Sequence, residues 1–203
     1  MLRLAVLLVA LAFVAGAVSS PGLSHVGHAR GTLSGVAVSG IGTSRGFEIY
    51  VARATDRWHW RALATLQPAG LSDDTWTGYA CVTGDTKHVI AVVAPRSFAN
   101  VPLLRDRGGT AYDVDLATGR VRPLVSSVSL KYHTPSCGRG STAVITRSLG
   151  RDQARTEVFV IDATHARVSR DLSVQGQVTS VVPTDLPETR NCFGVSSSTM
   201  AIF

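Results

Sequence analysis

The chain has 203 residues, 45% of them hydrophobic, which is sufficient for one domain with an ordinary core. Its 20 basic and 14 acidic residues give a formal net charge of +6 at pH 7, and all but two of the basic residues are arginines scattered along the sequence. A nucleic-acid surface normally shows clustered basic residues or an aromatic–basic motif. The composition therefore argues against a nucleic-acid partner, whereas the net charge leaves attraction to an anionic envelope polymer open.

The N-terminus has the layout of a secretory signal peptide. Arg3 precedes an unbroken apolar run from Leu4 to Val14, and the small residues Ala15 and Ala17 follow it. A membrane-spanning helix needs about 20 apolar residues, which is more than this run provides. We therefore interpret residues 1–17 as a cleaved leader, with an uncleaved anchor as the alternative. This interpretation predicts a secreted or envelope-associated protein with no stable membrane span after cleavage.

Residues 18–45 are rich in glycine, serine and other small residues, which predicts a flexible lead-in with one weak strand around Gly35 to Ser39. His25 and His28 lie at a spacing that zinc ligands use. Because no further ligand stands near them, we predict no metal site. Regular structure is expected to begin at Phe47.

From there the chain predicts strands and turns only. The first hairpin is expected at 47–66. Residues 77–83 then lead into a single strand at 88–94, and the second hairpin is expected at 110–125. The single-strand element repeats at 131–135 and 143–147, followed by the third hairpin at 157–172 and a last strand at 177–182. The nearly continuous apolar run at 88–94 is typical of a strand that is buried on both faces. The interruption at 96–109 is interpreted as a solvated surface loop, with a binding loop as the alternative.

Two motifs are each written twice. Cys81, Gly84 and Thr86 recur as Cys137, Gly140 and Thr142. A second set recurs at a constant offset of 47 residues, in which Tyr112, Val114, Asp115, Arg120 and Val121 become Phe159, Ile161, Asp162, Arg167 and Val168. A period of this size built from short strands is typical of propeller blades. Three units are visible, whereas a propeller ring closes with typically 4 to 8 blades. The sequence therefore predicts an all-β fold, an incomplete β-propeller of about three blades within residues 46–183.

The hairpin from Tyr112 to Val121 resembles the strand–turn–strand signature of bacterial propellers of the quinoprotein-like and WD40-like kind. The stretches 58–67, 78–95 and 128–137 are also similar to the N-terminal propeller-like region of large exported actinobacterial proteins, some of which carry golvesin-type or RHS-type modules. Quinone-binding propellers carry a tryptophan shortly after the Thr-Gly turn, where this chain has Pro123 and Leu124. The resemblance therefore implies a propeller module without a quinone, and no cofactor-binding residue is carried over.

The three cysteines are Cys81, Cys137 and Cys192. In an oxidising compartment a pair of them is expected to form a disulfide. Cys81 and Cys137 hold equivalent positions in the two motif copies, so a bridge between them would join neighbouring blades. The alternative is that equivalent positions lie beyond the roughly 7 Å Cα separation that a disulfide tolerates.

No catalytic residue is predicted. The Gly-x-Ser-x-Gly elbow and the calcium-loop order of aspartates do not occur, and Asp115 and Asp162 are interpreted as turn residues. His59 and His133 are interpreted as packing or edge residues. The three tryptophans are Trp58, Trp60 and Trp76. We predict that they pack in the core; the alternative is that they line a carbohydrate-binding surface.

After Thr184 the repeat pattern stops. Our hypothesis is that the reading frame was lost near Asp185, so that residues 184–203 are an out-of-frame tail; a blade pattern in another frame downstream would support it. The sequence as a whole predicts an exported, non-catalytic propeller segment that acts as a binding or scaffold module of a larger secreted or envelope protein. Its partner would be an unidentified protein or an envelope glycan. The alternatives are a fragment of a propeller-type polysaccharide hydrolase or lyase, and a truncated product without function.

Overall fold

The computed structural model describes residues 35–72, 75–131, 134–150, 152–178 and 180–183. The predicted leader, most of the lead-in and the predicted tail lie outside these residues. The described chain forms eleven strands and three short helical segments: β1 (Val36–Thr43), β2 (Gly46–Arg53), η1 (Ala54–Asp56), β3 (Arg61–Leu66), β4 (Trp76–Val82), β5 (His88–Pro95), η2 (Arg96–Asn100), α1 (Pro102–Arg107), β6 (Gly109–Asp115), β7 (Val121–Val128), β8 (Ser136–Cys137), β9 (Thr142–Leu149), β10 (Arg155–Asp162) and β11 (Arg167–Gln175).

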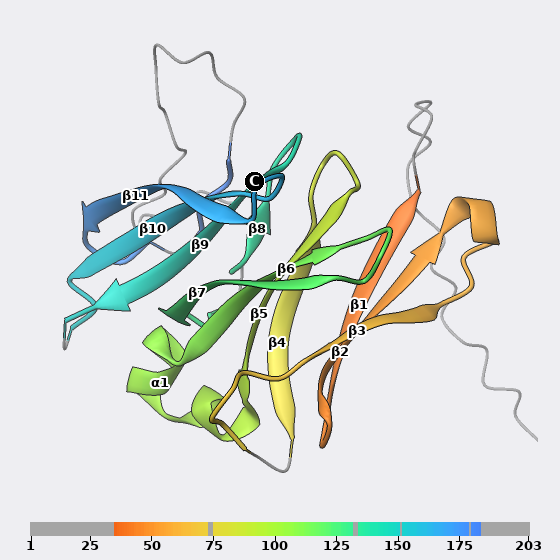
Figure 1. The fold of residues 1–203 in the computed structure, drawn as a ribbon. Coiled ribbons are helices and arrows are strands. Elements are labelled where there is room, and N and C mark those ends of the chain that lie inside the picture. Colours follow the sequence, from red (N-terminus) through yellow and green to blue (C-terminus); the bar gives the residue numbers. More distant parts are fainter. Residues whose placement is uncertain (1–34, 73–74, 132–133, 151, 179, 184–203) are drawn as a thin grey trace, which may run out of the picture. The chain divides into compact units, whose positions relative to one another are not determined.

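The strands form three antiparallel sheets in chain order (Figure 1). The first sheet has the order β1-β2-β3, the second β4-β5-β6-β7 and the third β8-β9-β10-β11. Within the described residues these sheets do not close into a ring. The predicted fold class is therefore confirmed: the chain is nearly all-β and has the architecture of an incomplete β-propeller.

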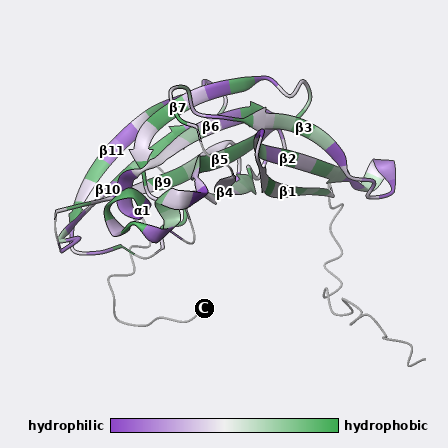
Figure 2. Cartoon of the chain, turned by 90° about the horizontal axis from the view of Figure 1, so that it is seen from below, coloured by the Kyte–Doolittle hydropathy of each residue, from purple (hydrophilic) through white to green (hydrophobic). Residues whose placement is uncertain are grey.

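The second sheet is buried on both faces because β5 alternates its side chains between two apolar clusters. Val89, Ala91 and Val93 pack with the first sheet, in a cluster that includes Phe47 and Ile49. Ile90, Val92 and Ala94 pack toward the third sheet. All eight residues of β5 are buried, as the continuous apolar run predicted. Figure 2 shows the hydrophobic residues concentrated along the central strands and hydrophilic residues interrupting β7 and β11.

Regular structure begins earlier than predicted. The weak strand expected around Gly35 to Ser39 is an eight-residue strand, β1, and it pairs with β2 along its whole length, from Val36 opposite Arg53 to Thr43 opposite Gly46. The small residues of β1 obscured it, because strand signals in sequence come mainly from β-branched and aromatic residues. Gly42 is small for a packing reason, since a Cβ there would lie 1.6 Å from the carbonyl oxygen of Trp76.

Two other expected strands are reduced. In the strand predicted at 131–135 the described residues are not in a strand, and the two-residue β8 follows them. In the strand predicted at 177–182 the described residues have only an isolated bridge at Val178. Instead, Val178 and Val181 pack with Val144 and Val158 on the outer face of the third sheet. The apolar character of this segment was correctly read, but a strand also needs a paired neighbour.

The interruption at 96–109 is not simply a solvated loop. It contains η2 and α1, with Pro102 at the start of α1, where proline is best tolerated in a helix. Asp106 of α1 is buried and lies 3.1 Å from Lys131 Nζ, which also donates hydrogen bonds to Ser148 Oγ and Gln153 Oε1. The segment is thus anchored to the third sheet by a partly buried lysine.

The duplicated hairpin turn works as predicted. Asp115 Oδ1 accepts hydrogen bonds from the backbone N–H groups of Ala117 and Thr118, at 2.9 and 2.8 Å, and from the Thr118 hydroxyl. Gly119 closes the turn at φ +71, and a Cβ there would meet the carbonyl oxygen of Leu63 at 2.7 Å. In the second copy Asp162 accepts from the backbone N–H of His165, so both aspartates are turn residues.

The backbone N–H of Thr118, followed by that residue's hydroxyl and the N–H of Ala117, lowers the pKa of Asp115. A carboxyl whose folded-state pKa is depressed adds stability above its unfolded pKa, and this contribution is lost as the pH falls through the folded value. We therefore expect Asp115→Asn, which keeps the acceptor oxygen but removes the charge, to be less stable than the wild type at pH 7. Urea midpoints of the two proteins should converge as the pH falls below the usual aspartate range. A difference that is constant with pH would contradict this.

Candidate interaction surface

The first sheet has one face in the core and one face open. In the β1–β2 register, Val38 opposite Val51 and Gly40 opposite Ile49 lie on the face toward the second sheet. The alternate pairs, Ser39 opposite Tyr50 and Ile41 opposite Glu48, lie on the other face. Because side chains alternate along a strand, this second face carries its own continuous row of residues.

A groove of about 500 Å³ lies on this second face and is lined by Ser39, Ile41, Tyr50 and Trp60. We call these four residues the open face. Ile41 is 52% exposed and Trp60 is 53% exposed. Single exposed apolar side chains are common on soluble proteins, whereas neighbouring ones that line a groove mark an interaction site.

The connection between β2 and β3 presents the tryptophans. Arg57 and Trp58 both have left-handed backbone conformations, with φ of 54 and 62, which are uncommon for bulky residues. Trp58 lies 51% exposed, and its ring is so near Gly35 that a Cβ there would lie 2.7 Å from the ring edge. The core-packing prediction is confirmed for Trp76, which is 1% exposed, and is wrong for Trp58 and Trp60. Alternation of bulk in sequence does not reveal which face of a sheet will be covered.

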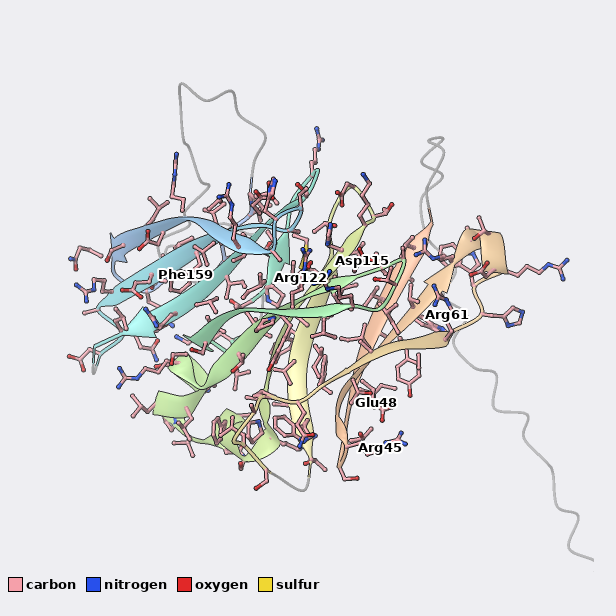
Figure 3. All side chains as sticks on the ribbon, viewed as in Figure 1. Arg45, Glu48, Arg61, Asp115, Arg122 and Phe159 are labelled. Atoms are coloured by element: carbon pink, nitrogen blue, oxygen red, sulfur yellow. A yellow bond between two sulfur atoms is a disulfide. The ribbon has the colours of Figure 1, made fainter. Side chains whose placement is uncertain are left out.

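A polar cluster borders the open face at the β1–β2 turn (Figure 3). Glu48 Oε1 accepts hydrogen bonds from Arg45 Nη2 at 2.7 Å and from Thr43 Oγ1 at 3.1 Å, and Glu48 Oε2 accepts from the Tyr50 hydroxyl at 2.6 Å. The Tyr50 hydroxyl and the Arg45 guanidinium lower the pKa of Glu48, and the same hydrogen bond raises the pKa of Tyr50. Glu48 is thus held ionised, with its oxygens engaged.

This arrangement is suited to non-covalent binding. The aromatic and aliphatic side chains offer a preformed apolar surface, and the hydrogen bonds of Glu48 fix the orientation of the Tyr50 ring. A general acid must carry a proton near the working pH. Glu48 is poorly suited to that task because its neighbours stabilise the charged form.

Two connections hold the second and third sheets together. The structure contains the Cys81–Cys137 disulfide, with a Cα separation of 5.8 Å, so the equivalent positions of the two motif copies lie within bridging distance. Beside it, the backbone N–H groups of Gly84 and Asp85 donate hydrogen bonds to the carbonyl oxygens of Gly138 and Gly140. The duplicated turns therefore contact one another directly.

A buried charged triad was not predicted from the sequence. Asp113 of β6 is fully buried; its Oδ1 lies 2.9 Å from His88 Nδ1, and its Oδ2 accepts from Arg122 Nε and Nη2 at 2.9 and 2.6 Å. Arg122 also donates to the carbonyl oxygen of Ala163, which directly follows β10 of the third sheet. The available signal was the pairing of three neighbouring strands: Arg122 lies opposite Asp113, and His88, two residues before Ile90, which also lies opposite Asp113, is on the same face of the sheet. Through these contacts the triad links the second sheet to the third.

The structure describes only one of the other histidines considered from the sequence. His59 is exposed, and His25, His28 and His133 lie outside the described residues. No group of three or more His, Cys, Asp or Glu residues that could hold a metal ion occurs in the described part of the chain. Nor does any helix there have the length and apolar character needed to cross a membrane.

Comparisons with known proteins identify similar folds. No family model and no curated protein matches this chain. Among solved structures, TolB from Acinetobacter baumannii is similar with 18% identity and a TM-score of 0.46, over 76% of this chain and 34% of that one. The β-propeller domain of the Trilobed protease from Pyrococcus furiosus, which has an open velcro topology, is similar with 12% identity and a TM-score of 0.38, over 68% of this chain and 38% of that one. The chain thus spans about a third of the length of the structures it matches.

Proposed function

We propose that this chain is an exported, non-catalytic β-propeller module that binds a partner through the open face of the first sheet. The observation that carries the proposal is the groove in which Ile41, Tyr50 and Trp60 stand together, with two of them about half exposed. Aromatic side chains at such positions provide much of the binding energy in protein and ligand interfaces. The partner belongs to one of two classes, an envelope glycan or a protein.

Export is supported by two observations. The first 17 residues have the layout of a signal peptide, and the Cys81–Cys137 bridge belongs to the kind of compartment in which disulfides persist. The scaffold role within a larger protein is supported by the three sheets, which leave the outer face of the first one uncovered in the described residues.

Tryptophan fluorescence tests the binding surface, because Trp58 and Trp60 are exposed whereas Trp76 is buried. We expect acrylamide quenching of the wild type to fall when purified peptidoglycan fragments are added, or when the protein concentration is raised. Trp60→Ala should weaken this association about tenfold, as expected for an aromatic at the centre of an interface.

The matched control is Val121→Ala, an exposed apolar residue on β7, which should behave as the wild type. If neither added peptidoglycan fragments nor a higher protein concentration reduces the quenching, the proposal is wrong. Equal effects of Trp60→Ala and Val121→Ala would place binding elsewhere.

A further inference from the structure

Within the described residues the first sheet has one strand fewer than the other two, and the position of the missing strand can be assigned. Strands β2 and β3 correspond to the duplicated hairpin: Val51 of β2 stands where Val114 stands in β6, and Arg57, before β3, stands where Arg120 stands before β7. Each of the pairs β2/β3, β6/β7 and β10/β11 also contains a register shift. By this correspondence β1 is equivalent to β5 and β9. The strand without a counterpart is therefore the one equivalent to β4 and β8, which would pair with the free edge of β1.

The described residues of the segment 177–183, which are all but Thr179, occupy the place of such a strand, but they lie against the third sheet. A Cβ on Gly84, after β4, would lie 2.7 Å from Arg139 Cα, after β8. In the same way a Cβ on Gly138, after β8, would lie 2.5 Å from Pro183 Cγ. The end of β4 thus contacts the end of β8, and the end of β8 contacts Pro183 in the same way. The segment therefore takes the position that the first strand of a following sheet would have. Val178 and Val181 bury its apolar side on the third sheet.

We propose that two copies of this chain associate head to tail, with residues 177–183 of each copy along the free edge of β1 in the other. This inference rests on the proposed function, since it identifies the partner of the open face. In this arrangement Ile41, Tyr50 and Trp60 pack on the outer face of the other copy's third sheet. Two copies supply six sheets, which lies within the 4 to 8 blades of closed propellers.

The chemistry of the two surfaces favours a second copy over a glycan. The edge of β1 offers backbone donors and acceptors that pair with no strand in the described chain, and such edges recruit an extended segment. The 177–183 segment is uncharged and has Val178 and Val181 on the side toward the third sheet. The groove is mainly apolar, with Ser39 and the Tyr50 hydroxyl as its polar groups. In this dimer each copy has both its β1 edge and its 177–183 segment covered by the other copy. The assembly is therefore closed, and no third copy can add to it.

The mass in solution tests the association. Light scattering on the full chain at micromolar concentration should give about twice the monomer mass of 21.4 kDa, corrected for any leader removed. Ile41→Arg, at a half-exposed position, should raise the dimer dissociation constant at least tenfold, whereas Val121→Arg on β7 should leave it unchanged. A monomer, or a ladder of larger species, would overturn the proposal.

Cross-linking distinguishes this geometry from a face-to-face dimer. In a Cys192→Ser background, Ser39→Cys and Ser180→Cys variants are prepared separately and then mixed with a short bismaleimide. The head-to-tail arrangement predicts a covalent dimer in the mixture and little in either variant alone. Efficient cross-linking of Ser39→Cys with itself would mean that two open faces meet, and would overturn the proposal. A monomer whose exposed tryptophans are still protected by peptidoglycan fragments would refute the second copy while supporting the proposed function.

Discussion

Removal of the Cys81–Cys137 bridge should lower the free energy of unfolding by about 4 kcal/mol, because the bridge closes a loop with a sequence separation of 56 residues and so restricts the unfolded chain. For a domain of this size, that loss corresponds to a fall of about 10 °C in the unfolding temperature. The variant is Cys81→Ala with Cys137→Ala, both in a Cys192→Ser background that prevents alternative pairing. Differential scanning calorimetry against the Cys192→Ser protein gives the comparison.

The alanine pair also removes two sulfur atoms that pack beside the cluster between the second and third sheets. The Cys192→Ser protein measured with a phosphine reductant separates the two effects, since it loses the covalent link but keeps the sulfur atoms. It should show most of the destabilisation. A reduced protein as stable as the oxidised one would mean that the Gly84 and Asp85 hydrogen bonds to the neighbouring turn are sufficient to hold the two sheets together.

The sequence was most informative where a residue's role depends on its near neighbours. Asp115 and Asp162 were predicted as turn residues because an aspartate oxygen at a hairpin entry accepts hydrogen bonds from backbone N–H groups only a few positions along the chain. The fully buried β5 was predicted because continuous apolarity reports burial on both faces. The correspondence of Cys81 and Cys137 came from the repeat, which relates distant positions without any knowledge of the packing.

Prediction failed where the role depends on what lies across a sheet or on a neighbouring sheet. Trp60 and Trp76 are the same residue type, yet one is half exposed and the other buried, because only one of them lies on a covered face. The groove is formed by Ser39 of β1 together with Tyr50 of β2, and the sequence indicated β1 only as a weaker and shorter strand than it is. Asp113 looks in sequence like its neighbour Asp115, and only strand pairing places it between His88 and Arg122.

The triad around Asp113 leads to the second large effect. Asp113 has no exposed surface, and its carboxylate is the counter-ion of Arg122 and a partner of His88. Removing one partner from a buried ionic group leaves an uncompensated charge, which typically costs 3–5 kcal/mol. Arg122 retains 28% of its side-chain exposure and can partly turn to water, so we expect Asp113→Ala to lower the free energy of unfolding by about 3 kcal/mol in urea denaturation. Asp171→Ala, at an exposed position on β11, is the control and should change it by less than about 0.5 kcal/mol.

The origin of the effect can be separated from simple loss of packing. If the cost arises from stranded charge, the triple variant Asp113→Leu, Arg122→Met and His88→Phe should be more stable than Asp113→Ala, because well-packed apolar replacements of a buried ionic group are often neutral. The triple variant also loses the Arg122 hydrogen bond to Ala163, which links the second sheet to the third. A triple variant at least as unstable as Asp113→Ala would therefore show that this link between sheets, and not charge compensation, is the main contribution of the triad.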